Sequence, residues 1–480
     1  MSVITRIPPS PTGLLHIGTL RTALYNYLFT KKHNGKMLFR SEDTDKDRST
    51  LAFEQDIFKG LVKLGLIEGN TEIIRQSERT EVYKKYLEKM LEEGSAYYCF
   101  CSQEDLEKEK EEQKAKKMPF RYSGKCKNHT KEESLARVES GEKAVIRLRV
   151  PENREVTFTD LIRGENTTHT KEIQDFVIAK NLDSPLYHLV VVIDDFEMKV
   201  THVLRGEDHI PNTSKQMLIA EALDIKIPEY GHMPLILNED KSKLSKRKNK
   251  VSVNDYLEEG YLEEAFLNFL VLLGWNDGTD NEIFSLEEMV ESFSLDRVHK
   301  GGAVFDLKKL EWINSQYIKN LSVEDLRKRV QKYLEETPFY EQVLLQGEEF
   351  LLKVLKILQS KLRKLSEIEE NLELFYKTPH PELDLLVNEK MKATKEIGKE
   401  ALEVAKEVFE NIDENNFTEE SFKSLIVEKI KEKGWKNGQF LWPLRACLSG
   451  LEFSPSPFEI AEAIGKQETL HRIERMLKKF

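Results

Sequence analysis

The chain has 480 residues, of which 73 are Lys or Arg and 84 are Asp or Glu, so its formal net charge is −11. With 33% charged and 39% hydrophobic residues, it has the composition of a soluble globular protein of two to four domains and is neither disordered nor fibrous. The apolar stretches at 186–193 and 266–275 are shorter than the roughly 20 residues that a membrane span needs. The N-terminus lacks the pattern of a secretory signal, so we expect a cytoplasmic protein without membrane contact.

The first hundred residues alternate between strand and helix patterns. This alternation is typical of a parallel α/β sheet. The predicted strands are 3–8, 36–40 and 73–76, and the predicted helices are 19–32, 50–66 and 78–93.

The pattern changes near residue 97 and changes back near 174. Residues 97–101 favour a strand, 104–117 favour a charged, solvated helix, and 143–165 favour two strands paired as a β-hairpin. A second α/β block follows 174. Beyond 320 the chain is predicted to be helical, without clear strands.

A Pro/Gly loop, PPSPTGLLHIG, joins the first strand to the first helix. It matches neither the P-loop nor the dinucleotide-binding pattern. A strand, a tight turn and a helix N-terminus in this order nevertheless form an anion site. Gly18 leaves room for a nucleotide near the backbone, and His16 is able to donate to a phosphate. The alternative is an ordinary loop with a surface histidine.

A basic segment, KSKLSKRKNK at Lys241–Lys250, follows Asn238–Asp240. Such a segment is usually a solvated or nucleic-acid-facing stretch. Opposite a helix N-terminus, a lysine-rich loop would also stabilise the charge of a departing pyrophosphate.

HIGT at His16–Thr19 and KLSKR at Lys243–Arg247 resemble the two signature motifs of class I aminoacyl-tRNA synthetases. The stretches RIPPSPTGLLHIGTLRTALYNYLF, LFRSEDTDKDRS, YHLVVVIDDFEMKVTHVLRGEDHIPNTSKQ, GYLEEAFLNFLVLLGW and SPSPFEIAEAIGKQETLHRIERML resemble the glutamyl-tRNA synthetase family, in order and over essentially the whole chain. Thr19, Leu244 and Arg247 depart from the general class motifs in ways that are common in the glutamate branch.

The resemblance implies an α/β fold in four parts. A Rossmann-like parallel-sheet catalytic domain would comprise 1–98 and 174–250, with an α+β, acceptor-binding insertion at 99–173. A stem-contact region would follow at 251–320, and an all-α anticodon-binding domain at 321–480.

The resemblance also implies the activity. The enzyme would use ATP and Mg²⁺ to join L-glutamate to the 3′ end of glutamate tRNA through a glutamyl-adenylate, releasing pyrophosphate and AMP. Whether glutamine tRNA is a second substrate stays open. We expect a monomer.

Residues at strand ends are candidates for the substrate pocket, because ligands bind there in open α/β sheets. Arg6 and Arg205 follow this rule, and guanidinium groups match carboxylates well. The resemblance assigns glutamate contacts to Arg6, Ser10, Glu42, Tyr187 and Arg205. It assigns ATP contacts to His16, Gly18, Thr19, His209, Lys243, Ser245 and Lys246, with His16, Lys243 and Lys246 catalytic. Val191 stands where some relatives have a polar residue.

Three of the four cysteines cluster in the predicted insertion, at Cys99, Cys101 and Cys126. This spacing suits a tetrahedral zinc site with one further ligand. Some members of the family carry a structural zinc here, and we favour Tyr122 as the fourth ligand, with His129 as the alternative. Cys447 lies alone in a helical stretch and is expected to be a buried apolar residue.

In the helical half, Lys361, Arg363 and Arg445 are plausible anticodon contacts, although each is equally a solvated cation. In relatives an Arg near the Lys361 position is linked to rejecting glutamine tRNA. The rival interpretations are a glutaminyl-tRNA synthetase, whose C-terminal part resembles β-barrels; the short relative that modifies a tRNA base, which lacks the helical half; and a non-catalytic tRNA-binding module.

Overall fold

The computed structural model describes residues 2–117, 121–244 and 252–480. These residues form two compact units, one of 1–256 with 266–307 and one of 257–265 with 308–480. None of the described helices has the length and apolar character that crossing a membrane requires.

The first unit begins with the predicted parallel sheet, in which β1 (Ile4–Ile7), β2 (Lys36–Ser41) and β3 (Ile73–Arg75) lie side by side in that order. The connecting helices are α1 (Ile17–Lys32), α2 (Leu51–Lys63) and α3 (Thr80–Glu92). Leu20, Leu24 and Leu28 of α1 recur at helical spacing and are fully buried, as the sequence periodicity predicts. The α/β prediction for this region is confirmed.

A second sheet has the order β10-β11-β6-β7. Its strands are β10 (His202–Gly206), β11 (Glu229–Met233), β6 (Glu155–Asp160) and β7 (Gly164–His169), and β10, β11 and β6 are parallel. The start of β10 adjoins the start of β1, because the Thr201 N–H donates to the Ile4 carbonyl over 2.9 Å. Helices α7 (Tyr187–Glu197) and α8 (Ile210–Ala222) flank β10 in the sequence.

The predicted hairpin at 143–165 is wrong. Its first strand, β5 (Val145–Leu148), pairs with β4 (Ala96–Cys99) and β8 (Val177–Asn181), and β9 (Ser184–Pro185) completes that sheet. The second strand, β6, instead forms a hairpin with β7. Alternation along a strand decides which face is buried but not which strand becomes its partner. Consequently β8 and β9, which follow the expected boundary at 173, share a sheet with β4 and β5.

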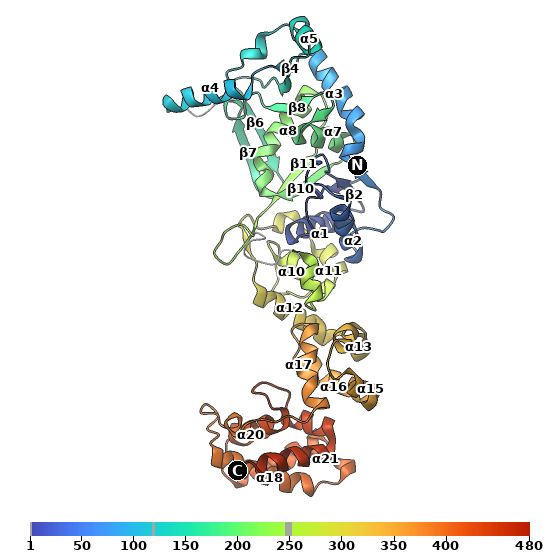
Figure 1. Cartoon of the computed structure of the whole chain (residues 1–480), viewed down its shortest axis with the longest axis vertical. Coiled ribbons are helices and arrows are strands. Elements are labelled where there is room, and N and C mark those ends of the chain that lie inside the picture. Colours follow the sequence, from blue (N-terminus) through green and yellow to red (C-terminus); the bar gives the residue numbers. More distant parts are fainter. Residues whose placement is uncertain (1, 118–120, 245–251) are drawn as a thin grey trace. The chain divides into compact units, whose positions relative to one another are not determined.

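The charged segment forms a helix, α4 (Gln103–Ala115), as predicted. It extends away from the β4-β5-β8-β9 sheet (Figure 1), and its residues are mostly exposed. The other small elements of this part are α5 (Lys131–Glu139) and α6 (Thr170–Ile173).

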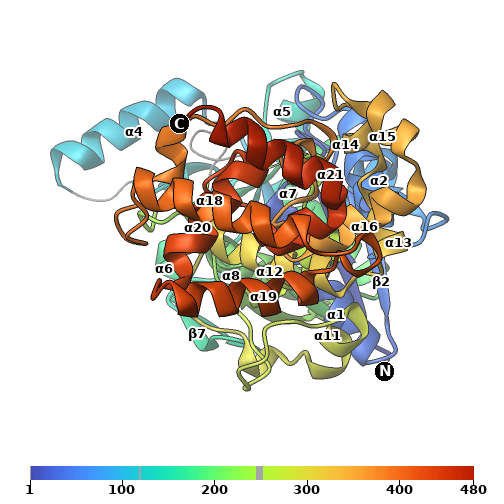
Figure 2. The ribbon, with the colours of Figure 1, turned by 90° about the horizontal axis from the view of Figure 1, so that it is seen from below.

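Beyond 320 the regular elements that the structure describes are all helices, as predicted. Helices α18 (Lys395–Glu410), α20 (Asn437–Ser449) and α21 (Pro457–Leu477) pack side by side (Figure 2). The remaining elements of the chain are α9 (Val253–Glu258), α10 (Glu263–Leu272), α11 (Leu286–Ser292), β12 (Ile236–Leu237), β13 (Ala303–Val304), α12 (Leu307–Asn320), α13 (Val323–Arg329), α14 (Gln331–Glu335), α15 (Tyr340–Gln346), α16 (Glu348–Gln359), α17 (Ile368–Tyr376) and α19 (Glu419–Glu432).

Candidate active site

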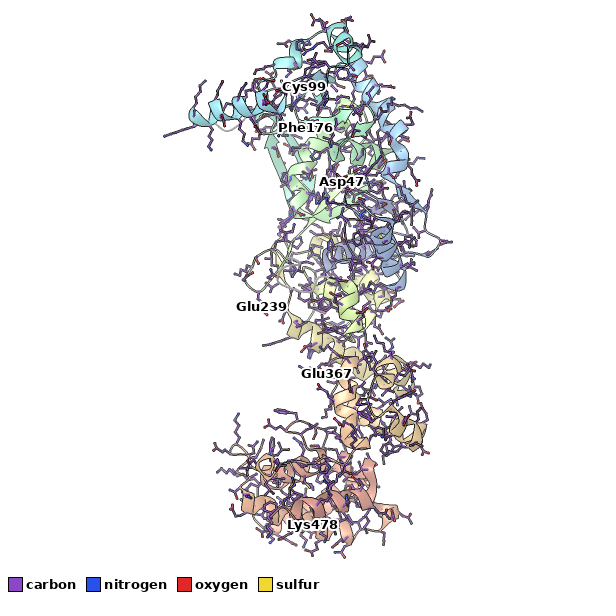
Figure 3. The ribbon with its side chains drawn as sticks, viewed as in Figure 1. Asp47, Cys99, Phe176, Glu239, Glu367 and Lys478 are labelled. Carbon is purple, nitrogen blue, oxygen red and sulfur yellow. The ribbon has the colours of Figure 1, made fainter. Side chains whose placement is uncertain are left out.

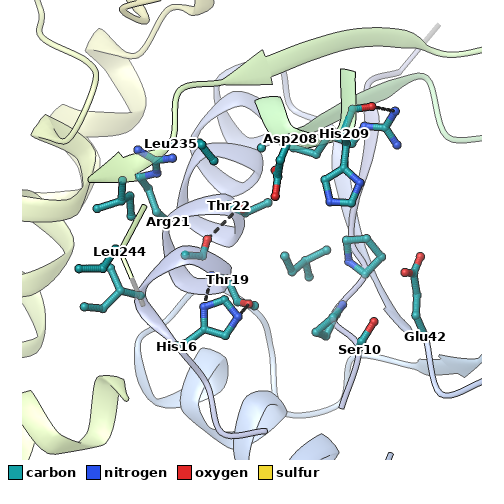
Figure 4. A pocket seen from close by; sticks show the side chains of 18 of the residues that line it. Ser10, His16, Thr19, Arg21, Thr22, Glu42, Asp208, His209, Leu235 and Leu244 are labelled. Carbon is teal, nitrogen blue, oxygen red and sulfur yellow. Dashed lines mark hydrogen bonds between the residues drawn. The ribbon is translucent and has the colours of Figure 1, made fainter. Parts of the chain in front are cut away.

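A pocket of about 550 Å³ lies in the first unit, where β1 and β10 end and α1 and α7 begin. Figure 4 shows Ser10, Glu42 and His209 on one side and Arg21, Leu235 and Leu244 on the other, with His16 and Thr19 between them. The lining includes all the predicted glutamate contacts and five predicted ATP contacts: Arg6, Ser10, Glu42, Tyr187, Arg205, His16, Gly18, Thr19, His209 and Lys243. Ser245 and Lys246 lie outside the described residues.

His16 caps the N-terminus of α1. Its backbone is extended, and its Nδ1 accepts a hydrogen bond from the Thr19 N–H over 3.2 Å, while its Nε2 lies 2.9 Å from the Thr19 hydroxyl. A Cβ at Gly18 would approach two atoms of the His16 ring to 3.2 Å. Gly18 therefore gives space to the imidazole, and a helix N-terminus such as this one favours the binding of an anion.

Arg6 is buried and is neutralised by Asp195, an acidic residue that the sequence analysis did not single out. Arg6 Nε lies 3.2 Å and Arg40 Nη1 lies 2.6 Å from the same carboxylate oxygen of Asp195. Arg40 Nη2 also reaches Glu42 over 3.3 Å. Burial raises the pKa of Glu42, although Arg40 and Arg6 oppose the shift. The Arg40 and Asp195 positions are 155 residues apart, so sequence spacing alone carried no signal for this pair.

Arg205, in β10, is 6% exposed and is held by neutral groups. Its Nε donates to His232 Nε2 over 3.1 Å, and its Nη2 donates to Thr213 Oγ1 over 2.8 Å and to Gln216 Oε1 over 2.9 Å. Burial lowers the pKa of Arg205, as expected for a guanidinium without a bonded carboxylate.

Among the described residues, three buried guanidinium nitrogens of the pocket lining make no hydrogen bond: Arg6 Nη1, Arg205 Nη1 and Arg21 Nε. Arg6 and Arg205 are the two predicted glutamate contacts among them. A buried charged donor without an acceptor is costly. An anionic group bound in the pocket would supply the missing acceptors.

Tyr187 and His209 face each other, with the phenol oxygen 3.4 Å from His209 Nδ1. Burial and the nearby charge of Glu42 raise the pKa of Tyr187, so its hydroxyl stays protonated. Burial and the charge of Arg205 lower the pKa of His209 to about 4. Both side chains are therefore neutral hydrogen-bonding groups near neutral pH.

Arg21 and Asp208 also line the pocket, and the sequence analysis missed both. Arg21 is buried and donates to the backbone oxygens of Leu273 and Pro234. Asp208 forms an ion pair with Lys243. Arg21 lies two residues beyond the HIGT motif, and this proximity was the available signal.

The three clustered cysteines converge. The sulfur atoms of Cys99, Cys101 and Cys126 all lie within 4.8 Å of one another, and Figure 3 labels Cys99. The Tyr122 hydroxyl lies 3.2 Å from Cys99 Sγ and 3.8 Å from Cys101 Sγ.

His129 makes its hydrogen bond elsewhere, because its Nε2 lies 3.3 Å from Arg137 Nη1. Three thiols and a phenol on one centre are a suitable donor set for tetrahedral zinc. Cys447 is buried, as expected for an apolar role.

The predicted anticodon contacts lie in the second unit. Lys361 and Arg363 are exposed in the turn after α16, and Arg363 forms ion pairs with Glu311 and Glu367. Arg445 is half-buried in α20.

Comparison with known proteins matches most of the chain. Residues 2–312 match the family described as tRNA synthetases class I (E and Q), catalytic domain, and residues 325–477 match an anticodon binding domain. Glutamate–tRNA ligase 2 of Caldicellulosiruptor saccharolyticus is 40% identical, covering 100% of this chain and 99% of its own. The glutamate–tRNA ligase of Carboxydothermus hydrogenoformans is 41% identical, covering 98% of this chain and 99% of its own. A crystal structure of a glutamate tRNA ligase from Elizabethkingia meningosepticum, in complex with its amino acid, is 33% identical over 100% of this chain and 99% of that one, with a TM-score of 0.84.

Proposed function

The chain belongs to the class I tRNA synthetase family for glutamate, and from this we propose that the pocket at the ends of β1 and β10 joins glutamate to ATP. The protein is a glutamate–tRNA ligase, which charges tRNA with glutamate at the expense of ATP for translation.

The observation that carries the proposal is that Arg6 Nη1 and Arg205 Nη1, in one pocket, have no hydrogen-bond partner among the described residues. Glutamate has two carboxylates, and each nitrogen donates a hydrogen bond to one of them. Glu42, whose carboxylate lines the same pocket, binds the ammonium group. Ser10 and the Tyr187 hydroxyl supply further hydrogen bonds.

The charges of the pocket favour glutamate over glutamine. Four guanidinium groups, of Arg6, Arg40, Arg79 and Arg205, lie in or next to this end of the pocket with three carboxylates, of Glu42, Asp194 and Asp195. This end of the pocket therefore has an excess of one positive charge. Glutamate carries a net charge of about −1 near neutral pH, because both carboxylates are ionised. Glutamine has no net charge and would leave one guanidinium uncompensated.

The ATP phosphates bind at the N-terminus of α1, near His16 and Lys243, together with Mg²⁺. A glutamate carboxylate oxygen attacks the α-phosphorus of ATP, a new P–O bond forms, and the bond to pyrophosphate breaks. His16, Lys243 and Lys246 stabilise the charge that develops on the departing pyrophosphate. A terminal ribose hydroxyl of tRNA then attacks the adenylate and releases AMP.

The helical unit binds the anticodon, with Lys361, Arg363 and Arg445 among its contacts. Lys361 is exposed, which suits a residue that reaches a nucleotide. The tRNA set contains glutamate tRNA, and glutamine tRNA is the second candidate. The cysteine cluster holds a structural Zn²⁺ through Cys99, Cys101, Cys126 and Tyr122, supported by the convergence of their side chains.

Glutamate-dependent ATP–pyrophosphate exchange tests the reaction. It is measured with no tRNA, with glutamate tRNA and with glutamine tRNA. Exchange with glutamate tRNA is expected, and exchange with glutamine tRNA as well would indicate a ligase that charges both. No exchange under any condition would favour a non-catalytic tRNA-binding protein.

Arg205→Gln tests the residue assignment. We expect this variant to raise the KM for glutamate about 100-fold, since hydrogen bonds to charged groups contribute about 1.5–3 kcal/mol each, while the KM for ATP changes little. Arg154→Gln is the matched control, because Arg154 pairs with Glu221 at the surface and does not line the pocket. Equal glutamate KM values for the two variants would refute the assignment.

A further inference from the structure

A buried chain of three side chains ends at Arg205. His232 and Asp160 are 0% and 2% exposed. His232 Nδ1 lies 2.5 Å from Asp160 Oδ2, and His232 Nε2 accepts from Arg205 Nε over 3.1 Å. Neither His232 nor Asp160 is among the residues that line the pocket, so the two act on a ligand only through Arg205.

The hydrogen-bond pattern determines which nitrogen of His232 carries the proton. A guanidinium Nε can only donate, so His232 Nε2 must present a lone pair to it. The proton is then on Nδ1, where the Asp160 carboxylate accepts it. Burial lowers the pKa of His232, which keeps the ring neutral, although the bond to Asp160 opposes the shift.

Asp160 is itself locked in place. Its Oδ1 accepts the backbone N–H groups of Ile162 over 2.9 Å and of Arg163 over 2.8 Å. These bonds and the one from His232 lower the pKa of Asp160, although burial by itself raises it. The carboxylate is therefore ionised and its second oxygen always faces His232.

The arrangement decides which edge of Arg205 meets a ligand. His232 occupies Nε, and Thr213 and Gln216 occupy Nη2. Nη1 is left for the pocket. If the guanidinium of Arg205 rotated about its last side-chain bonds, Nη1 would no longer face the pocket. Glutamate would then bind more weakly, whereas the binding of ATP would not change.

We propose that His232 is a positioning residue for glutamate, which holds Arg205 in its binding orientation through an imidazole tautomer imposed by Asp160. This inference rests on the proposed role of Arg205. It adds a specificity device in which a buried carboxylate, remote from the substrate, controls a substrate-binding guanidinium.

Asp160→Asn is the decisive variant, because it changes no volume. The Asn oxygen must remain toward the Ile162 and Arg163 N–H groups, so its NH₂ group replaces Oδ2 and faces His232. The imidazole proton then moves to Nε2 and opposes the Arg205 N–H. We expect the KM for glutamate in aminoacylation to rise about 10- to 100-fold, which corresponds to losing a hydrogen bond to a charged group, with the KM for ATP unchanged.

Nitrogen-15 NMR of labelled histidine provides a readout that general destabilisation would not produce. The His232 signal, identified by its absence in His232→Gln, is expected to show protonation at Nδ1 in the native protein and at Nε2 in Asp160→Asn. An unmoved proton, or an unchanged glutamate KM, would overturn the proposal.

Two variants of His232 itself test whether Arg205 needs a hydrogen-bond acceptor at this position. The Gln oxygen in His232→Gln is able to accept from Arg205 Nε, whereas His232→Leu offers no acceptor. Glutamate KM is expected to be lower in His232→Gln than in His232→Leu, and Asp160→Asn is expected to have little further effect in the His232→Gln background. Equal effects of Asp160→Asn in both backgrounds would show a purely structural role.

The outcomes separate this proposal from the proposed function. If Arg205→Gln leaves the glutamate KM unchanged, the assignment of Arg205 fails. If Arg205→Gln raises it and Asp160→Asn does not, Arg205 keeps its role and the positioning role of His232 is refuted.

Discussion

The ammonium group of Lys243 lies 2.8 Å from the carboxylate of Asp208, which follows β10 at the edge of the pocket. This ion pair places the first lysine of the KLSKR motif beside the residues that precede α8. Both side chains are substantially exposed, so the pair itself contributes little to stability. The pair matters for ATP binding, because the ATP phosphates bring further negative charge to the same lysine.

Asp208→Asn removes a carboxylate from the phosphate-binding end of the pocket. Asp208 competes with the ATP phosphates for Lys243, and repulsion between exposed like charges costs up to about 1 kcal/mol. Because the substitution removes this repulsion, we expect the KM for ATP to fall about two- to fivefold. Pyrophosphate exchange at varied ATP concentration measures it. An increased ATP KM would show that Asp208 instead holds Lys243 in its working position.

Gly18→Ala separates stability from activity. Gly18 is the second residue of α1, and in its first turn alanine is favoured over glycine by less than the roughly 1 kcal/mol of a helix interior. The new Cβ would lie 3.2 Å from the His16 ring, so the imidazole must move. We expect an unchanged or higher urea midpoint together with kcat/KM for ATP reduced about tenfold, because positioning of catalytic groups is steeply distance-dependent.

Gly398→Ala is the control for this substitution. Gly398 is in α18, and its added Cβ would meet ordinary contacts at 3.5 Å or more. It should gain helix stability without any change in activity. Normal activity in Gly18→Ala would contradict the role of the Gly18 space.

Zinc content distinguishes the two candidates for the fourth ligand. Tyr122→Phe removes the hydroxyl that lies 3.2 Å from Cys99 Sγ, and we expect weaker zinc binding. His129→Gln, whose native ring bonds to Arg137, should retain zinc. Metal analysis after dialysis against a chelator measures both, with Cys126→Ser as the variant that loses the metal. Loss of zinc in His129→Gln alone would reverse the ligand assignment.

Stability is expected to decrease in mildly acidic solution because of two half-buried histidines, His188 and His209. Burial lowers the pKa of both His188 and His209 from 6.5 to about 4, with Lys215 and Arg205 as the next contributors. Between these values the unfolded chain binds more protons than the folded chain, so the free energy of unfolding falls as the pH falls. The contribution of these neutral histidines to the free energy of unfolding is fully present above pH 6.5, and it is lost as the pH falls toward the lowered pKa of about 4.

Urea unfolding at a series of pH values tests this dependence. His188→Gln is the informative variant, since His188 does not line the pocket. Its unfolding midpoint should decrease less steeply than that of the native protein over the same pH range. Parallel pH profiles would show that His188 is not the titrating group.

Breaking the Arg6–Asp195–Arg40 cluster should be severe. Asp195→Asn leaves two buried guanidinium groups without their shared carboxylate. Removing one partner of a buried ion pair costs about 3–5 kcal/mol. Thermal unfolding measures the change, and a loss below about 1 kcal/mol, the usual value for an exposed pair, would contradict the burial of these charges.

Local features explain what was predictable. The helix that begins after His16 follows from a capping side chain and from Leu20, Leu24 and Leu28 at helical spacing, all within a few residues. Residues next to strand ends were good candidates because parallel strands bring their carboxyl ends to one edge. The sequence by itself therefore determined the α/β order, the helical half, the family and the residues expected at the pocket.

Only the tertiary structure decided which distant groups become partners. The face of β6 is a property of its own alternation, but its pairing with β7 instead of β5 depends on the competition among whole strands. In the same way, the sequence shows an acidic residue at Asp195, but it does not show that this carboxylate forms an ion pair with Arg6, 189 residues away. The Asp160–His232–Arg205 chain appears for the same reason, because its three members belong to three strands that become neighbours only when the sheet forms.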